Sequence, residues 1–258
     1  MIICFDVDGV LVEVGPSYYR ALAETVSSFL GKPVDSGLLL RLKFGLNLNN
    51  DWDATLAGIL FYQSGLEPEK FVSQLAPGPP DFRKFYARAA EEKIKLPDYD
   101  RLVEKFEALY RKYRPLETLK ISPANLAEIK SLAGRLAVIT GRTREDLDYT
   151  FNKFSLYRFF EVIIAEDDLP SVETRKPSSY PLKLLFEKSG YSRPACYLGD
   201  TLADSQMVEN FNREDGRKVF FVLFKNALNS GVKADFYVEN EKELLQFIKN
   251  FTQGKDFS

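Results

Sequence analysis

The chain has 258 residues, of which 45% are hydrophobic and 28% charged, so it can bury a sizeable core and is not a disordered segment. The 35 basic and 37 acidic residues give a net charge of −2, which excludes the basic field that general nucleic-acid binding needs. The sequence contains no histidine, which excludes Ser-His-Asp and Cys-His catalysis and histidine-ligated zinc.

Other features of the chain bear on its location. No run approaches the ~18 apolar residues of a membrane helix, and the first residues lack the basic flank and cleavage site of a signal peptide. The two cysteines, Cys4 and Cys196, are too few for a disulfide framework. We therefore expect a reduced, cytoplasmic protein with neither a membrane nor a nucleic acid as partner.

The first half of the chain is predicted to be almost entirely helical. Residues 2–7 form an apolar run before Asp8-Gly9, which indicates a buried strand that ends in a turn. Helical patterns follow, beginning near Pro16 and Asn50 and continuing over roughly 68–76, 81–95 and 98–113. The segment Pro77–Pro80 is expected to be a loop between two of these helices.

After Pro115, short apolar strands alternate with helices. Strands are expected near 135–140, 161–165, 195–198, 218–224 and 236–238, and the last helix at 241–251. Continuously apolar strands between helices are typical of a parallel sheet that is covered on both faces. We therefore predict an α/β core made of residues 1–14 and 116–258, into which an all-α domain of residues 15–115 is inserted.

Polar residues follow the predicted strands at the edge where open α/β sheets bind ligands. They are Asp6, Asp8, Thr140, Lys176, Asp200 and Asp204. Four carboxylates in one place repel each other unless a cation is present, and oxygen donors without nitrogen or sulfur select Mg²⁺. An acidic, cation-binding edge with a lysine suits phosphoryl transfer.

Four segments occur in a fixed order along the chain. They are Asp6-Val-Asp8-Gly-Val, Thr140-Gly141, Lys176-Pro177 and Gly199-Asp200-Thr-Leu-Ala-Asp204. Together they resemble the four motifs of the haloacid dehalogenase superfamily, in the phosphoglycolate phosphatase-like subfamily with a helical C1-type cap. The resemblance covers the whole chain, and it implies a Rossmann-like parallel sheet core with an inserted helical cap domain.

The resemblance also implies roles for individual residues. Asp6 would be the nucleophile that forms an aspartyl-phosphate, and Asp8 would act first as acid and then as base. Thr140 would bind the phosphoryl oxygens, and Lys176 would neutralise their charge. The Mg²⁺ ligands would be Asp6, the backbone carbonyl of Asp8, Asp200 and Asp204, in part through water. Residues i and i+2 of an extended segment share a face, so the carboxylates of Asp6 and Asp8 can reach one substrate.

Substrate contacts are harder to assign. The candidates are Gly141, Arg142, Tyr19, Arg20, Lys43 and Asn49. Arg142 either touches the substrate or pairs with Glu145 or Asp146. Segment 166–168 is either a solvated acidic loop or supplies one carboxylate to the metal, and the polar run 47–52 either contacts the substrate or is a capped loop in which Trp52 packs.

We therefore expect a Mg²⁺-dependent phosphatase that hydrolyses a small phosphorylated metabolite, as a monomer or homodimer. A helical cap that closes over the site favours a small metabolite, because a closed lid excludes macromolecules. Two alternatives stay open. A sugar phosphomutase would keep the same core residues but release an isomerised sugar phosphate, and a non-catalytic protein would bind the phosphorylated ligand without turning it over.

Overall fold

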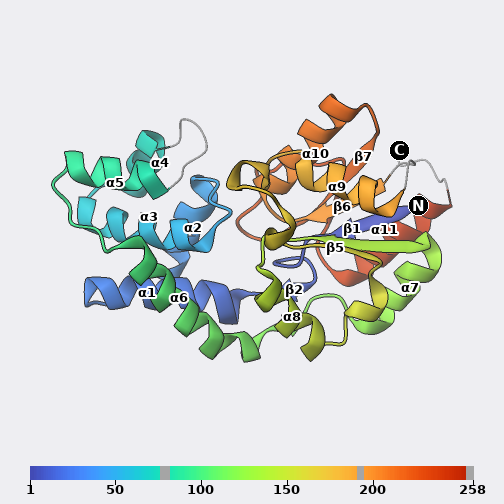
Figure 1. Cartoon of the computed structure of the whole chain (residues 1–258), viewed down its shortest axis with the longest axis horizontal. Helices are drawn as coiled ribbons and strands as arrows, with labels where there is room; N and C mark the ends of the chain where they lie inside the picture. Colours follow the sequence, from blue (N-terminus) through green and yellow to red (C-terminus); the bar gives the residue numbers. More distant parts are fainter. Residues whose placement is uncertain (76–81, 191–194, 254–258) are drawn as a thin grey trace. The chain divides into compact units, whose positions relative to one another are not determined.

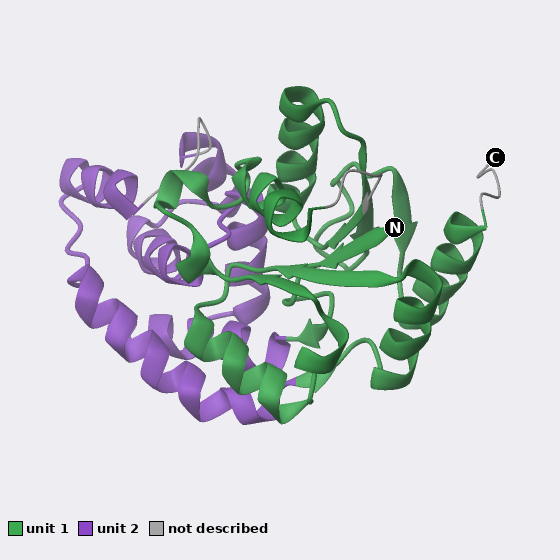
Figure 2. Ribbon diagram, turned by 45° about the vertical axis from the view of Figure 1, so that its right-hand side comes forward, with its two compact units in different colours: residues 1–13, 118–258 green, residues 14–117 purple. Residues whose placement is uncertain are grey.

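The computed structural model describes residues 1–75, 82–190 and 195–253 (Figure 1). These residues form two compact units, one of residues 1–13 and 118–258 and one of residues 14–117 (Figure 2). The predicted loop Pro77–Pro80 lies outside the described residues. Within the described ranges, no helix is both long and apolar enough to cross a membrane.

The first unit is built on a six-stranded sheet in which every neighbouring pair of strands is parallel. The strands, in spatial order, are β5 (Val162–Ile164), β4 (Arg135–Ile139), β1 (Ile2–Phe5), β6 (Ala195–Gly199), β7 (Val219–Phe224) and β8 (Phe236–Val238). Phe5 of β1 is in register with Val138 of β4 and Leu198 of β6. The predicted α/β class with a parallel sheet is confirmed, and the N-terminal strand lies in the interior of the sheet.

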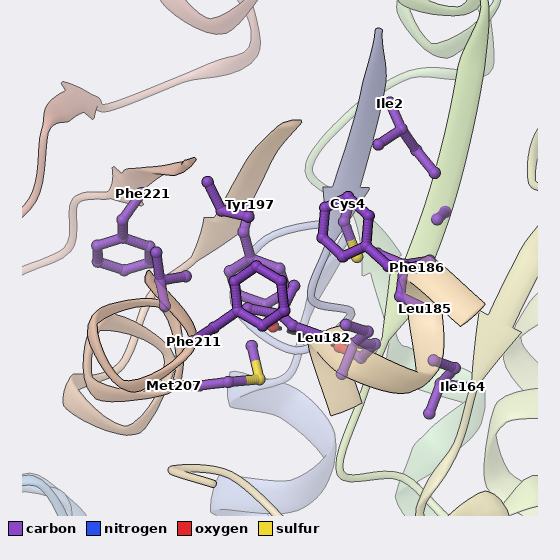
Figure 3. Packing of buried hydrophobic residues seen from close by; sticks show 14 of the residues in the cluster. Ile2, Cys4, Ile164, Leu182, Leu185, Phe186, Tyr197, Met207, Phe211 and Phe221 are labelled. Atoms are coloured by element: carbon purple, nitrogen blue, oxygen red, sulfur yellow. Dashed lines mark hydrogen bonds between the residues drawn. The ribbon is translucent and has the colours of Figure 1, made fainter. Parts of the chain in front are cut away.

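Helices cover both faces of this sheet (Figure 1). Helices α9 (Tyr180–Ser189) and α10 (Leu202–Asp215) pack on one face, and α7 (Pro123–Ala133) and α11 (Glu241–Thr252) pack together on the other. Figure 3 shows the core under α9 and α10, where Cys4 and Tyr197 meet the stacked rings of Phe186 and Phe211, whose centroids are 5.2 Å apart. Strand residues alternate between the two faces, and helices cover both faces, so the strands are buried on both sides.

The second unit is helical. It contains the π-helix η1 (Gly15–Tyr19) and helices α1 (Arg20–Leu30), α2 (Ser36–Gly45), α3 (Asp51–Ser64), α4 (Pro68–Leu75), α5 (Phe82–Glu91) and α6 (Tyr99–Tyr113). The Asn50 side chain caps α3 by accepting from the amides of Trp52 and Asp53. The rings of Tyr18 and Tyr110 stack with centroids 4.0 Å apart. The predicted helical insert is confirmed, and α2 is a helix that the sequence pattern did not reveal.

The insert leaves and rejoins the sheet unit beside a short antiparallel pair of strands, β2 (Val12–Glu13) and β3 (Thr118–Leu119). The sequence did not predict this pair, because two-residue strands carry no periodicity that can be read. Next to it, within the helical unit, the hydroxyls of Ser17 and Tyr110 donate to the buried carboxylate of Glu117. The two ends of the insert are therefore tied to each other both in the sheet unit and in the helical unit.

Candidate active site

The end of β1 places Asp6 at the centre of the carboxyl edge of the sheet. The Asp6 amide donates to the carbonyl of Leu198 on β6 at 2.8 Å, so the backbone is still part of the sheet at this point. The chain then turns tightly, since the amides of Leu11 and Val12 both donate to the carbonyl of Val7. Gly9 has φ +72°, a conformation that favours glycine.

Lys176 joins two of the predicted carboxylates. Its Nζ lies 3.1 Å from Oδ1 of Asp6 and 2.8 Å from Oδ1 of Asp204. The same atom lies 5.3 Å from the centroid of the Tyr197 ring. Burial alone would lower the pKa of Lys176, but the carboxylates of Asp204 and Asp6 outweigh it and raise the pKa above its ordinary value. The lysine is therefore a fixed cation.

Asp204 is fully buried and accepts hydrogen bonds on both oxygens. Oδ1 accepts from Lys176 and from the hydroxyl of Tyr197 at 2.9 Å. Oδ2 accepts from the amides of Asp200 and Thr201 and from the Thr201 hydroxyl. Burial would raise the pKa of Asp204, but Lys176 and these hydrogen bonds hold it below its ordinary value, so the group is ionised.

The carboxylates of Asp6, Asp200 and Asp204 form a cluster in which one oxygen from each lies within 4.8 Å of one oxygen from each of the others. Burial and the neighbouring carboxylates raise the pKa of Asp6 to about 7, against the lowering effect of Lys176. Burial, Asp204 and Asp6 also raise the pKa of Asp200 well above its ordinary value. When all three carboxylates are ionised beside one lysine, the cluster carries two negative charges, which a divalent cation neutralises. The all-oxygen donor set and this charge fit Mg²⁺.

Asp8 is held by a buried arginine. Nε of Arg142 lies 2.8 Å from Oδ1 of Asp8, and Nη2 lies 2.6 Å from it. The arginine side chain is 0% exposed, whereas that of Asp8 is 34% exposed. Arg142 also donates to Thr150, and its amide donates to the hydroxyl of Thr140. From the sequence we expected Arg142 to contact the substrate or to pair with Glu145 or Asp146. The ion pair with Asp8 was not expected.

The acidic segment 166–168 is tied to two arginines. The Arg144 guanidinium lies 2.5 Å from Asp168, and its backbone amide donates to Asp167. The Arg175 guanidinium lies 2.7 Å from Glu166. These pairs favour the interpretation of the segment as a structural acidic loop, because each of its carboxylates has a protein partner.

Sequence reasoning missed several residues that contact or influence the cluster, among them Tyr197, Lys120, Asn226 and Asn229. Tyr197 donates to Asp204, and Lys120 opposes the rise in the pKa of Asp200. The two asparagines follow β7: Asn226 donates to the side chain of Asp200, and Asn229 donates to its backbone carbonyl. A polar Asn-Ala-Leu-Asn stretch directly after a predicted strand was the signal that could have revealed them.

The four predicted substrate contacts of the cap lie in the unit of residues 14–117. Nζ of Lys43 lies 2.5 Å from Asp51 and 5.3 Å from the centroid of the Tyr19 ring. Arg20 pairs with Glu24 at 3.1 Å, and Asn49 is exposed. Tyr19 and Arg20 also line a pocket of about 410 Å³ within this unit. Arg20 and Lys43 therefore form charged pairs within this unit, and Tyr19 and Arg20 border its pocket.

A doubly covered parallel sheet with a buried acidic cluster and a lysine at its carboxyl edge is an arrangement typical of α/β enzymes that act on phosphoryl groups. The family model for haloacid dehalogenase-like hydrolases matches residues 1–212. The chain belongs to the haloacid dehalogenase-like hydrolases, as its four sequence motifs indicated.

Similarity to individual proteins is more distant. An imidazoleglycerol-phosphate dehydratase of Phytophthora nicotianae is 28% identical over 209 residues, which are 77% of this chain and 39% of that protein. The pyrophosphatase PpaX of Bacillus cereus is 25% identical over 157 residues, 60% of this chain and 65% of that one. The chain thus spans less than two thirds of these curated relatives. The structure of phosphatase Tt82 from Thermococcus thioreducens superposes with a TM-score of 0.69 at 22% identity, covering 98% of this chain and 100% of that one.

Proposed function

We propose that the protein is a Mg²⁺-dependent phosphatase that hydrolyses a small phosphomonoester through an aspartyl-phosphate. The observation that carries this proposal is the placement of Lys176 between Asp6 and Asp204, beside Asp200. A carboxylate paired with a fixed cation at the carboxyl edge of an α/β sheet is placed to attack phosphorus. Asp8, two residues further on, supplies the second carboxylate that the chemistry needs.

Mg²⁺ would be held by the carboxylates of Asp6 and Asp200 and by the backbone carbonyl of Asp8. Asp204 already accepts five hydrogen bonds from Lys176, Tyr197, Asp200 and Thr201, so we propose that it contacts the cation through water. When bound, the ion neutralises negative charge on the phosphoryl group and on the cluster.

The chain's own residues divide the reaction into two steps. In the first, a carboxylate oxygen of Asp6 bonds to phosphorus as the bond to the leaving oxygen breaks, and Asp8 gives that oxygen a proton. In the second, Asp8 takes a proton from water, which attacks phosphorus and releases Asp6 and phosphate. Lys176 and Thr140, with backbone amides at the start of α8 (Arg144–Lys153), would stabilise charge on the phosphoryl oxygens.

The proposed substrate is a small phosphorylated metabolite. Relatives named as a phosphatase and a pyrophosphatase support a phosphate-containing substrate. Gly141 and Arg142 lie beside the phosphoryl-binding Thr140, although the buried Arg142 guanidinium reaches Asp8 instead of an open surface. In the cap, the proposed contacts to the leaving group are Tyr19, Arg20, Lys43 and Asn49.

A panel of phosphorylated metabolites, assayed for free phosphate with and without Mg²⁺, tests this proposal. We expect EDTA to abolish turnover of at least one compound and Mg²⁺ to restore it, with Asp6→Asn as the inactive control. Release of an isomerised sugar phosphate without free phosphate would establish the phosphomutase alternative. Saturable binding of a panel compound without any turnover would establish the non-catalytic alternative.

Gly9→Ala should disrupt the cation site. A Cβ at this position would lie 2.0 Å from Oδ2 of Asp200, so the carboxylate has to move. We expect the Mg²⁺ concentration for half-maximal activity to rise at least about tenfold. Gly216→Ala is the matched control, because Gly216 also has a positive φ, +78°, with nothing within 4 Å of its added Cβ. An unchanged Mg²⁺ requirement in Gly9→Ala would contradict the assignment of Asp200 as a ligand.

A further inference from the structure

The loop after β7 carries a pair of asparagines that are locked to each other and to Asp200. Asn229 is 1% exposed. Its side-chain nitrogen Nδ2 donates to the backbone carbonyls of Asp200 at 2.8 Å and Phe224 at 2.9 Å. Its side-chain oxygen Oδ1 accepts from the backbone amide of Asn226 at 2.9 Å. Asn229 thus fixes both the position of Asn226 and the backbone that carries Asp200.

The orientation of the Asn226 side chain follows from its other hydrogen bond. Oδ1 accepts from the backbone amide of Leu228 at 2.8 Å. A backbone N–H can only donate, so the oxygen must be on that side and the amide nitrogen must point the other way. Nδ2 lies 3.3 Å from Oδ2 of Asp200.

We propose that the Asn226–Asn229 loop is an outer clamp that orients the Asp200 carboxylate for Mg²⁺ and sets the affinity of the cation site. The inference rests on the metal site of the proposed function. The Asp200 carboxylate is confined from two directions: Gly9 approaches so closely that no side chain fits there, and Asn226 donates from the loop. Partners that hold a metal-binding carboxylate in place raise affinity, because the ligand does not have to be ordered when the ion binds.

The turn itself does not need the amide nitrogen of Asn226. An Asx turn uses only the side-chain oxygen, here on the amide of Leu228, and a serine hydroxyl makes the same kind of turn. Serine is too short to reach Asp200 as well. Asn226→Ser therefore removes the bond to Asp200 while it keeps an acceptor for the turn.

Asn240 offers a matched control in the same unit. Its Oδ1 accepts from the amides of Lys242 and Glu243, and its Nδ2 donates to the carboxylate of Glu243 at 3.0 Å. Asn240→Ser makes the same chemical change: the turn keeps a side-chain acceptor, and the hydrogen bond from the side-chain amide to a carboxylate is lost. The carboxylate involved belongs to an exposed residue at the start of α11 and not to the acidic cluster.

The experiment titrates the metal-free full chain with Mg²⁺ at constant temperature by calorimetry, which gives the binding midpoint, and measures the unfolding temperature with and without Mg²⁺ as a second readout. We expect Asn226→Ser to shift the Mg²⁺ midpoint to about tenfold higher concentration, the lower end of what such outer partners contribute, and Asn240→Ser to leave it within about twofold. Because the readout is cation binding, it needs neither a substrate nor an active enzyme.

Each outcome of the titration has a separate meaning. The clamp is overturned, and the cation site kept, if the wild type is stabilised by Mg²⁺ and Asn226→Ser has the same midpoint. If Asn226→Ser unfolds at a lower temperature without Mg²⁺ but keeps the wild-type midpoint, the loop has only a structural role and the clamp is again wrong. A wild type that Mg²⁺ does not stabilise at all overturns the cation site and the clamp together.

Discussion

Asp6→Asn should lower turnover by at least about 1000-fold, which corresponds to roughly 4 kcal/mol of activation free energy. The amide is nearly isosteric with the carboxylate, but it cannot act as the nucleophile that forms the acyl phosphate. Lys176 would keep its second partner, Asp204, so the lysine stays in place. Initial rates on the best compound of the metabolite panel measure the effect, and a loss of less than about tenfold would exclude a covalent role for Asp6.

The pH dependence of stability provides a check on the fold of this variant. In the metal-free protein the pKa of Asp6 is raised to about 7, from the ordinary value of 3.8. The folded state therefore holds a proton that the unfolded state has lost, and stability falls as pH rises from about 4 to about 7. Asp6→Asn has no such proton, so its unfolding temperature should fall less steeply over this range. A slope equal to that of the wild type would contradict the raised pKa.

Much of this site was predictable because its residues are placed by the backbone. Asp6, Thr140 and Asp200 each follow an apolar strand, and parallel strands bring their carboxyl ends to one edge. The pattern of strands and helices thus predicts that Asp6 and Asp200 lie at the same edge of the sheet. The same pattern predicted the helical insert, since no strand periodicity occurs between the first turn and about residue 115.

The partners of these residues were not predictable in the same way. Asp8 and Arg142 are 134 residues apart in the sequence, and nothing in either segment marks the other as its partner. The bond from Tyr197 to Asp204 depends on which face of β6 the ring occupies. The strand order that puts β7 beside β6, and so Asn226 near Asp200, is set by packing of the whole sheet and not by a local signal.

Asp8→Asn should slow hydrolysis of an alkyl phosphate by about 10² to 10⁴, the range expected for loss of a general acid. The loss should be at least tenfold smaller for the first step on p-nitrophenyl phosphate, roughly 1.4 kcal/mol of barrier, because p-nitrophenolate departs without a proton. Hydrolysis of the aspartyl-phosphate still needs a base, so we expect a burst of p-nitrophenol before slow turnover. Equal losses on both substrates with no burst would contradict the role of Asp8 as acid and then base.

Arg142→Lys extends this test to the residue that holds Asp8. Lysine keeps the positive charge but cannot supply the two nitrogens, Nε and Nη2, that lie 2.8 Å and 2.6 Å from Oδ1 of Asp8. We expect the variant to lose about tenfold in turnover of the alkyl phosphate and less in turnover of p-nitrophenyl phosphate. In the Asp8→Asn background the same change should cost nothing further, since two residues that act as one unit are not additive.

Arg144→Lys is the matched control for Arg142→Lys, because it makes the same substitution two positions away in an arginine that pairs with Asp168. It should leave the ratio of the activities on the alkyl phosphate and on p-nitrophenyl phosphate unchanged. Suppose that Arg142→Lys lowers activity on both substrates equally and that this loss of activity persists in the Asp8→Asn background. The arginine then contributes only to the packing of the core. A cost confined to the alkyl phosphate and abolished by Asp8→Asn means that the buried guanidinium acts through the orientation of the Asp8 carboxylate.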